Sequence, residues 1–337
     1  MNKRVTLIDI AEKVGVSNVA VHKALNDKPG VSDEMRAKIK QVAQEMGYQG
    51  TVAAKQEPAK MIGVVIPETY YGFSGTFYGQ LYEKVVKALQ KYNSYGILEL
   101  LTPDMQKKKI KPQMVQDHRI EGLILMGIID EQYVNMIQQE VKLPVVFLDT
   151  YFSTQQLDTV ISDGYYGTYM LTKRLISLGH RKIAFVGSVD QTSSIADRYY
   201  GYRRALRENG ISFIDEWEIP DRDENGYIFE HIITEIPDCT AYVCNCDMTA
   251  DIVIGDLEKL GMRVPEDISV VGFDNIIPVG FVDRNITTYE VNMDRMAELS
   301  VRMIVNKINH DDSYNGIQIV SGRMVEKSTM AAVKKNK

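Results

Sequence analysis

Apolar positions in the first fifty residues recur with the spacing of one face of an α-helix. The first such stripe consists of Leu7, Ile10, Ala11 and Val14. Thr6 can cap this helix, and Gly15 can end it because glycine readily adopts the left-handed conformation. Ser17 and Ser32 can cap two more helices, whose apolar stripes are Val21, Ala24 and Leu25 in one and Met35, Ile39, Val42 and Met46 in the other. Residues 1–48 are therefore predicted to form a helix-turn-helix unit.

The pattern changes after this unit. Residues 49–60, QGTVAAKQEPAK, lose the apolar periodicity and are predicted to be a linker. Beyond them, continuous apolar runs typical of strands buried on both faces occur at 61–67, 122–126, 145–149, 183–187, 241–244 and 268–273. Amphipathic helical stretches lie between them, at 77–92, 164–179, 196–209 and 247–260. This alternation predicts an α/β core with two doubly wound parallel sheets in residues 61–337.

The composition is that of an ordinary globular protein, with 45% hydrophobic and 25% charged residues. No run approaches the ~20 apolar residues of a membrane span, and the polar N-terminus has no signal-peptide core, so we expect a cytoplasmic protein. The cysteines, Cys239, Cys244 and Cys246, are expected to be ordinary thiols because their spacing fits no usual zinc site. We expect no metal and no cofactor.

Charge is distributed unevenly, and the basic part coincides with the predicted helix-turn-helix unit. Residues 1–60 contain ten Lys and Arg against seven Asp and Glu, a net charge of +3, whereas the whole chain carries −6. A basic head on an acidic body suits a protein that contacts nucleic acid at one end only.

The second helix of such a unit enters the major groove of double-stranded DNA, where Asn can pair with adenine, Lys with guanine and Val with a thymine methyl. The candidate base-contacting residues are Asn18, Val19, His22, Lys23 and, at the end of the helix, Asn26. Thr6 and Ser17 are candidates for phosphate contacts. A three-helix bundle with a solvated polar face is the alternative that this pattern leaves open.

Polar residues follow the predicted strands at the edge where open parallel sheets bind ligands. They are Asp149, Asp163, Asn245, Asp247 and Asp274, and Arg198 begins a helix nearby in the sequence. Tyr70, Phe73 and Phe77 follow the first strand, whereas Tyr78 and Tyr82 are expected to pack in the core. Aromatic rings that stack on C–H faces, beside charged groups that bind hydroxyls, would make a sugar pocket. Any one aspartate could instead be a helix N-cap.

Sequence signatures of catalysis do not occur. There is no phosphate loop G-x-x-x-x-G-K-[ST], no nucleophile elbow G-x-S-x-G, and no dinucleotide fingerprint G-x-G-x-x-G after the first strand. The five histidines are scattered, and none pairs with a Ser or Cys nucleophile. We therefore expect a protein that is not an enzyme.

The sequence resembles the lactose-repressor (LacI/GalR) family over essentially its full length. The resemblance is carried by VTLIDIAEKVGVSNVAVHKALNDKPGVSDEMRAKIKQVAQEMGY and by LISLGHRKIAFVG, DRYYGYRRAL, VPEDISVVGFDN and ITTYEVNMDRMAE. It implies a homodimer on a pseudopalindromic operator, with a core like the periplasmic sugar-binding proteins. In that fold the chain crosses between two lobes three times, so lobe 1 would be about 61–161 and 291–320, and lobe 2 about 162–290 and 321–333.

Carried over by position, the resemblance implies base-reading roles for Asn18, Val19 and Lys23. It implies effector contacts for Asp149, Arg198, Asn245, Asp247 and Asp274. Two features depart from the family pattern. The family usually has T-V-S-R-V-L where this chain has AVHKAL, and Lys23 lacks the planar fork of arginine, so a different base preference is expected.

The linker is the second departure, because it lacks the leucine that the family wedges into the minor groove. Val52 could substitute for it, but Gly50 and Pro58 disfavour a long helix, so weaker DNA bending is expected. The C-terminal segment VEKSTMAAVKKNK has no leucine heptad, which favours a dimer over a coiled-coil tetramer.

The expected effector is a small neutral sugar or polyol held between the lobes. Asp149, Asp247 and Asp274 against the single Arg198 would accept hydroxyl protons and repel phosphate. Effector binding would shift the population of lobe arrangements and so change the spacing of the two heads, as expected for a transcriptional repressor. Two alternatives remain open: a regulator whose core responds to a protein partner, and a sugar-binding protein with no role on DNA.

Overall fold

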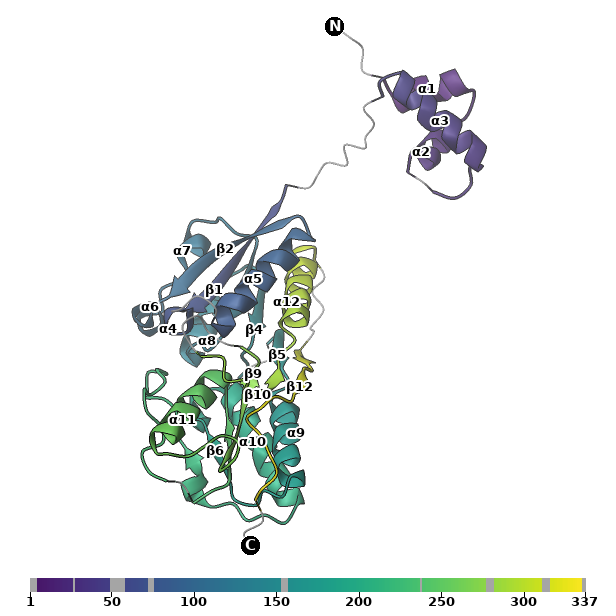
Figure 1. Cartoon of the computed structure of the whole chain (residues 1–337). Coiled ribbons are helices and arrows are strands. Elements are labelled where there is room, and N and C mark those ends of the chain that lie inside the picture. The colour runs from purple at the N-terminus through teal and green to yellow at the C-terminus, as the bar shows by residue number, and fades with distance from the viewer. Residues whose placement is uncertain are drawn as a thin grey trace. The chain divides into compact units, whose positions relative to one another are not determined.

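The computed structural model describes residues 5–26, 28–48, 58–71, 76–152, 157–236, 238–276, 282–310 and 316–334. The chain divides into two compact units, Met1–Ala59 and Lys60–Lys337 (Figure 1). Most of the predicted linker, with Gly50 and Val52, lies outside the described residues, and so does Phe73. None of the helices in the described ranges is long and apolar enough to cross a membrane.

The smaller unit is a bundle of α1 (Leu7–Val14), α2 (Asn18–Leu25) and α3 (Asp33–Glu45). Thr6 and Asp9 form a capping box at the start of α1, and Gly15 ends that helix in the left-handed conformation, at φ 77°. The hydroxyls of Ser17 and Ser32 cap α2 and α3. The bundle closes around Ile10, Ala11, Val21, Ala24, Ile39 and Ala43. The helix-turn-helix fold predicted from the apolar spacing is confirmed.

Within its described residues, the larger unit contains two six-stranded sheets, one in each lobe. Lobe 1 has the order β11-β5-β4-β3-β1-β2, formed by β1 (Lys60–Pro67), β2 (Ser94–Leu101), β3 (Gly122–Met126), β4 (Val145–Leu148), β5 (Thr159–Ser162) and β11 (Ile317–Val320). Lobe 2 has the order β12-β10-β9-β8-β6-β7, formed by β6 (Ile183–Val186), β7 (Glu218–Ile219), β8 (Ala241–Cys244), β9 (Ser269–Asp274), β10 (Thr287–Glu290) and β12 (Arg323–Val325). Every paired neighbour is parallel except β10 and β12 in the described ranges.

Helices cover the sheets. Lobe 1 carries α4 (Glu68–Tyr71), α5 (Phe77–Gln90), α6 (Pro103–Lys108), α7 (Gln113–Gln116), α8 (Glu131–Glu140) and α12 (Met293–Ile308). Lobe 2 carries α9 (Gly164–Ser177), α10 (Ser193–Glu208) and α11 (Asp247–Lys259), with short 3-10 turns at Val189–Gln191 and Asp215–Trp217. Figure 1 shows α5 beside α12, and these helices are in contact. The doubly wound fold class is thereby confirmed.

The central strands are buried on both faces, as their continuous apolar runs predict. Along β1, Val64 packs in the cluster that contains Leu81 of α5 and Ile304 of α12. Its neighbour Val65 points to the other side, into the cluster that contains Tyr133 of α8. Alternate residues of one strand thus enter two different apolar layers.

In the described residues the chain passes between the lobes at three places. These are the connections from β5 to α9, from β10 to α12, and from β11 to β12. The second crossing brings α12 back against β3, β4 and β5, and the third follows β11, which pairs with β5. Both lobes are therefore built from separate stretches of the chain.

Candidate functional site

The exposed face of α2 carries the side chains predicted to read DNA. Val21 and Ala24 are buried against the bundle, so the opposite face of the helix is open. Asn18 and His22 are exposed, and Val19 is 64% exposed. A valine this exposed on a short, fully capped helix contributes nothing to packing, which fits a surface that contacts a partner. Lys23 is half-buried, with its side chain lying against Gly30.

The other predicted contact residues of the head already have hydrogen bonds. Thr6 donates its hydroxyl to Asp9 Oδ2 at 2.6 Å. Ser17 Oγ accepts from the Ala20 amide at 3.2 Å, which leaves its own proton available. Asn26 is exposed, and its side-chain amide donates to the His22 carbonyl at 2.8 Å.

Arg36 of α3 holds the last turn of α2 and the segment that follows it, a role that no pattern in the sequence predicts. Its Nη1 donates to the carbonyls of Lys23 and Ala24, at 3.3 and 3.4 Å. Its Nη2 donates to the carbonyls of Lys28 and Val31, at 2.9 and 3.5 Å. Carbonyls at the end of a helix need donors, and here one guanidinium supplies them, so the position of α2 depends on α3.

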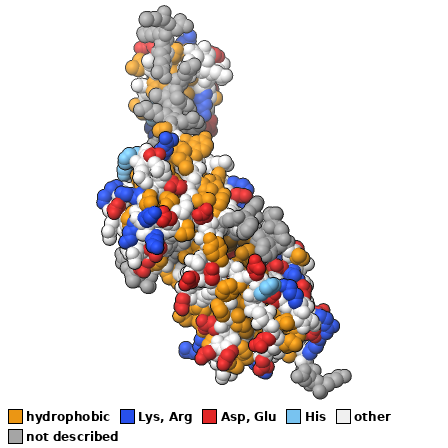
Figure 2. Space-filling model, turned by 90° about the vertical axis from the view of Figure 1, so that its left-hand side faces the viewer, with side chains coloured by type: hydrophobic (Ala, Val, Ile, Leu, Met, Phe, Trp, Pro, Cys, Tyr) orange, Lys and Arg blue, Asp and Glu red, His pale blue; other side chains and the backbone are white. Residues whose placement is uncertain are grey.

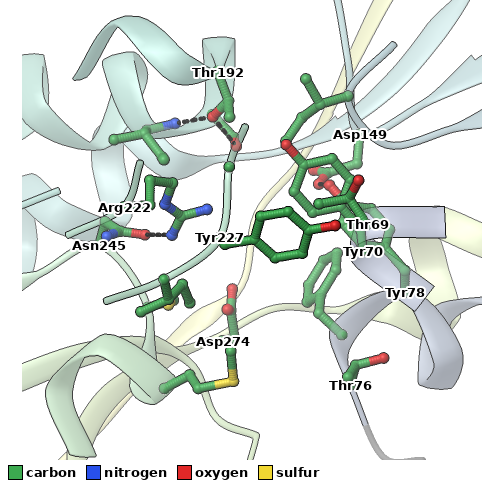
Figure 3. A pocket seen from close by; sticks show the side chains of 18 of the residues that line it. Thr69, Tyr70, Thr76, Tyr78, Asp149, Thr192, Arg222, Tyr227, Asn245 and Asp274 are labelled. Atoms are coloured by element: carbon green, nitrogen blue, oxygen red, sulfur yellow. Dashed lines mark hydrogen bonds between the residues drawn. The ribbon is translucent and has the colours of Figure 1, made fainter. Parts of the chain in front are cut away.

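The core contains a cavity of about 680 Å³ at the carboxyl ends of strands from both sheets. Lobe 1 contributes Tyr70, Phe77, Tyr78 and Asp149, and lobe 2 contributes Arg198, Asn245, Asp247 and Asp274 (Figure 3). Seven residues predicted from strand ends and from the segment after β1 therefore lie around one space. They are Tyr70, Phe77, Asp149, Arg198, Asn245, Asp247 and Asp274.

Arg198 lies at the centre of the polar wall. It is 5% exposed, and its Nη1 donates to the Asn245 carbonyl at 2.5 Å. Its Nη2 lies 3.3 Å from Asp274 Oδ1, and the guanidinium lies over the ring of Phe273 at 4.0 Å. An ion pair, a carbonyl and an aromatic face hold this side chain in place, so it is prepared to contact a ligand.

Two buried carboxyls face the cavity from opposite lobes. Asp149 accepts from the Tyr78 hydroxyl at 2.9 Å, and burial raises the pKa of this carboxyl to about 6 although Arg198 opposes the shift. Asp247 accepts from the Ile276 amide at 2.9 Å, and burial, with the nearby charge of Asp274, raises its pKa to about 8. Low exposure disfavours the charged form of both groups.

Asp274 interacts electrostatically with Asp149 and Arg198. Burial raises the pKa of Asp274, and the guanidinium of Arg198 acts in the opposite direction. Asp149 and Asp274 also adopt positive φ values of 63° and 108°. Such backbone strain is concentrated at binding sites, where the surrounding structure imposes it.

Three of the buried polar atoms around this cavity have no hydrogen-bond partner within the described residues. They are Asp149 Oδ1, Arg198 Nε and Asp247 Oδ1. Buried polar atoms are nearly always paired in folded proteins, so these three are exceptions that lie together beside the cavity. Oδ1 of Asp247 lies against Gly272 of β9.

Arg222 also lines the cavity, and the sequence reasoning missed it. Its partner Asp221 is fully buried and accepts from Arg222 Nε and Nη2 at 3.0 and 2.8 Å. Asp221 also accepts from Asn245 Nδ2 at 2.6 Å and from the Thr249 hydroxyl at 2.7 Å. Burial would raise the pKa of Asp221, but the bonds and charge of Arg222, with the other donors, lower it to about 2.

This pair corrects the expectation of a pocket with one arginine, because two guanidiniums lie in its wall. Asp221 follows β7, which has only two residues, in the turn-rich segment IPDRDENGY. That segment resembles a solvated loop in the sequence. The one available signal was the place of Asp221 after a strand, and β7 is too short to be recognised.

The remaining predicted residues lie elsewhere or have a double role. Asp163 is the N-cap of α9, accepting from the Tyr166 amide at 3.1 Å, and is not part of the cavity wall. Tyr78 is buried in the core as expected, and its hydroxyl also reaches the cavity. The three cysteines are free; Cys246 lines the cavity and caps α11. No group of metal-ligating side chains occurs in the described ranges.

The surface of the core carries charges of both signs. On the face shown in Figure 2, Lys and Arg side chains of the core are interspersed with Asp and Glu and with hydrophobic side chains. They form no continuous basic stripe on that face. This agrees with DNA contact through the head.

Comparison with known proteins gives matches over both units. Residues 6–50 match the model of the lacI family of bacterial regulatory proteins, and residues 172–330 match that of the periplasmic binding protein-like domain. The HTH-type transcriptional repressor PurR of Pectobacterium atrosepticum is 25% identical over 334 residues, 97% of each chain. The ribose operon repressor of Haemophilus influenzae is 27% identical over 318 residues, 92% of this chain and 94% of that one.

A solved structure gives the same picture of the fold. The transcriptional regulator CelR in complex with cellobiose has a TM-score of 0.68 at 20% identity. The match covers 97% of this chain and 100% of that one. At this identity the likeness concerns the fold alone.

Proposed function

Because this chain belongs to the lacI family of bacterial regulatory proteins, we propose that it is a sequence-specific transcriptional repressor controlled by a small ligand. Its head binds operator DNA, and its core binds the ligand in the cavity between the two lobes. It works as a homodimer in the cytoplasm, with one head on each half of a pseudopalindromic operator.

One observation carries the ligand-controlled part of this proposal. The two lobes place the charged side chains of Asp149, Arg198, Arg222 and Asp274 around one cavity of about 680 Å³. A structural core would not concentrate charged side chains around open space. A ligand with several hydroxyl groups can both donate to and accept from such groups.

The effector class that we propose is a neutral sugar or polyol. Arg222 adds a second positive charge to the wall, but its guanidinium is paired with Asp221 at 2.8 Å. Arg198 is paired in turn with Asp274. Neither arginine is left with an unmatched charge for a phosphate, and the carboxylate of Asp149 would repel one. The name of the ribose operon repressor supports the same class.

The mechanism is a shift between lobe arrangements. A ligand that contacts Asp149 of lobe 1 and Arg198 of lobe 2 binds only when the lobes are at one particular separation. It therefore stabilises that arrangement by its difference in affinity for the two states. Because the heads follow the cores of a dimer, this arrangement changes the distance between the two recognition helices.

The DNA-binding part is tested with the full-length protein. Selection from a random duplex library, followed by fluorescence anisotropy on the selected site, should give a specific complex. Lys23→Ala should weaken this complex by at least tenfold, because Lys23 lies on the helix that enters the groove. Lys91→Ala, on the core, is the matched control. Equal affinity of Lys23→Ala and the parent protein would remove this residue from the interface.

The ligand-binding part is tested by thermal shift against sugars, polyols, sugar phosphates, nucleobases and amino acids. Binding to the folded state raises the melting temperature. A neutral sugar should do so in the parent protein but not in Asp274→Ala or Arg198→Ala, both of which should still bind the selected DNA. A protein partner as the signal would instead leave both variants fully responsive in cells, and low-micromolar binding of a sugar phosphate would refute the neutral class.

A further inference from the structure

The cavity has two chemically different ends, and we infer that its ligand is a glycoside of two rings, one held at each end. The inference rests on the proposed function and specifies its ligand. The polar end holds one sugar ring by hydrogen bonds. The aromatic end, formed by Tyr70 and the hairpin 222–228, holds a second ring by stacking.

The polar end is the deep end of the cavity. Asp149 is 4% exposed, Arg198 5% and Asn245 1%. Asp149 accepts from the Tyr78 hydroxyl here, and Arg198 donates to the Asn245 carbonyl. The hydrogen-bonding groups are thus concentrated where water is excluded and where a buried sugar ring would have to satisfy them.

The aromatic end is open to solvent. Tyr227 is 58% exposed, and Figure 3 shows it projecting from lobe 2 toward Tyr70 and Tyr78 of lobe 1. The side chain of Tyr70 is half-buried and lies 5.9 Å, centroid to centroid, from Tyr78. Two tyrosine rings that come from opposite lobes at the mouth of a cavity can bind the C–H faces of a sugar ring.

The hairpin that carries Tyr227 is held rigidly. The Asp223 carboxylate accepts from the amides of Asn225 and Tyr227, both at 2.9 Å, and the Asp223 amide donates to the Tyr227 carbonyl at 3.0 Å. Gly226 has φ 87°, and a Cβ added there would lie 2.8 Å from the Tyr70 hydroxyl. The turn therefore passes directly against Tyr70. The backbone of Tyr227 is thus fixed at the mouth of the cavity, where its exposed ring can contact a ligand.

Arg222 joins the two ends. Its Nε and Nη2 are bound by Asp221, and Nη2 also lies 3.3 Å from Asn245 Oδ1 at the polar end. It begins the hairpin 222–228, which carries Tyr227 at the aromatic end. Its guanidinium is thus fixed where the linkage between two rings would lie.

The size of the cavity agrees with two rings. A single pyranose of about 12 non-hydrogen atoms occupies roughly 200 Å³ at protein packing density. The cavity measures about 680 Å³. One ring fills less than half of this volume, which leaves room for a second ring beside Tyr70 and Tyr227.

The test compares single sugars with disaccharides that contain them. Isothermal titration calorimetry on the full-length protein uses glucose, galactose and mannose, their methyl glycosides, and cellobiose, maltose, lactose and mannobiose. The best disaccharide should bind at least tenfold more tightly than its own monosaccharide and methyl glycoside. A monosaccharide that binds as tightly as every disaccharide containing it would overturn the two-ring inference and leave ligand-controlled repression intact.

Variants identify the contact that makes the difference. Tyr227→Ala should lower disaccharide affinity at least tenfold and leave monosaccharide affinity within twofold, and Tyr227→Phe should restore it because the ring is kept. Tyr200→Ala is the matched control, since Tyr200 is also in lobe 2 and also 58% exposed. Unchanged disaccharide affinity in Tyr227→Ala would refute the aromatic end. Failure of every carbohydrate to bind would overturn both this inference and the sugar class, while DNA binding, measured separately, would still stand.

Discussion

At the scale of the residue, the wall of the cavity depends on a carboxylate, Asp221, that does not itself line the cavity. Asp221 is fully buried and fixes the guanidinium of Arg222, which is itself 9% exposed at its side chain. Removing one partner of a buried ion pair leaves the other charge uncompensated, at a cost of about 3–5 kcal/mol.

We therefore expect Asp221→Ala to lower the free energy of unfolding of the core by about 3 kcal/mol or more. Urea denaturation followed by circular dichroism measures this change. Glu224→Ala, an exposed change in the same segment, should have no effect. Because the pKa of Asp221 is lowered to about 2, its contribution is present above about pH 4 and is lost as the pH falls through 2. A loss below 1 kcal/mol at neutral pH would contradict this role.

Residues of the site could be predicted where they follow a recognisable strand. Asp149 comes directly after VVFL, and Asn245 follows AYVC, so their edge of the sheet was evident from the sequence. Asp163 follows TVIS in the same way, yet it caps a helix at a lobe crossing. The sequence could not distinguish the two cases, because the direction in which a strand-end residue points depends on the lobe it leaves.

At the scale of the element, the N-terminal caps explain why the helices of the head could be predicted from the sequence. Each helix begins after a Thr or Ser whose hydroxyl accepts a first-turn amide, so its start is marked by residues next to it in the sequence. The edge strands have no such local signal. β2 lies at the edge of its sheet with Tyr95 60% exposed, and β11 alternates exposed isoleucines, so neither shows a continuous apolar run.

Arg36 is the element-scale contact that we expect to matter most in the head. Arg36→Met keeps the aliphatic stem but removes the donors to carbonyls in the last turn of α2 and just after it. We expect the head to lose about 1 kcal/mol, the net contribution of a typical hydrogen bond, because the Lys23 carbonyl keeps its bond from the Lys28 amide. Hydrogen exchange over residues 18–31 should accelerate, and operator affinity should fall, while the melting of the core stays unchanged. Lys38→Met, on the exposed side of the same helix, is the control. Equal exchange rates in the two variants would contradict the role of Arg36.

At the scale of the whole molecule, polar contacts join the lobes. The Tyr151 hydroxyl, after β4 of lobe 1, donates to Asp197 Oδ1 of α10 in lobe 2 at 2.8 Å. Gly226 of lobe 2 lies against Tyr70 of lobe 1. Such contacts depend on how two separately folded lobes meet, which no local pattern records. The sequence therefore predicted both lobes but not the hairpin between them.

The junction of the lobes also predicts how the stability of the core depends on pH. Asp247 has its pKa raised to about 8 by burial and by Asp274, so near pH 7 the folded core holds a proton that the unfolded chain has released. A state that binds more protons loses stability as the pH rises, until the folded pKa is passed. Asp149, whose pKa is about 6, has released most of its proton by pH 6.5. The change in stability above pH 6.5 therefore comes mainly from Asp247 and its neighbour Asp274.

From pH 6.5 to pH 8.5 we expect the core to lose about 1–2 kcal/mol, seen as a fall of ~3 °C in its melting temperature. Asp247→Asn cannot ionise at this position and should show a clearly smaller fall across this interval, with the remainder coming from Asp274. Asp238→Asn, whose side chain is 87% exposed, should keep the slope of the parent protein. Scanning calorimetry in buffers of matched ionic strength makes the comparison. If Asp247→Asn and the parent protein fall in parallel, the proton lost in this interval comes from another group. Asp247 would then be ionised in the empty cavity, and its unpartnered oxygen would be a stronger acceptor for a ligand hydroxyl than a neutral acid.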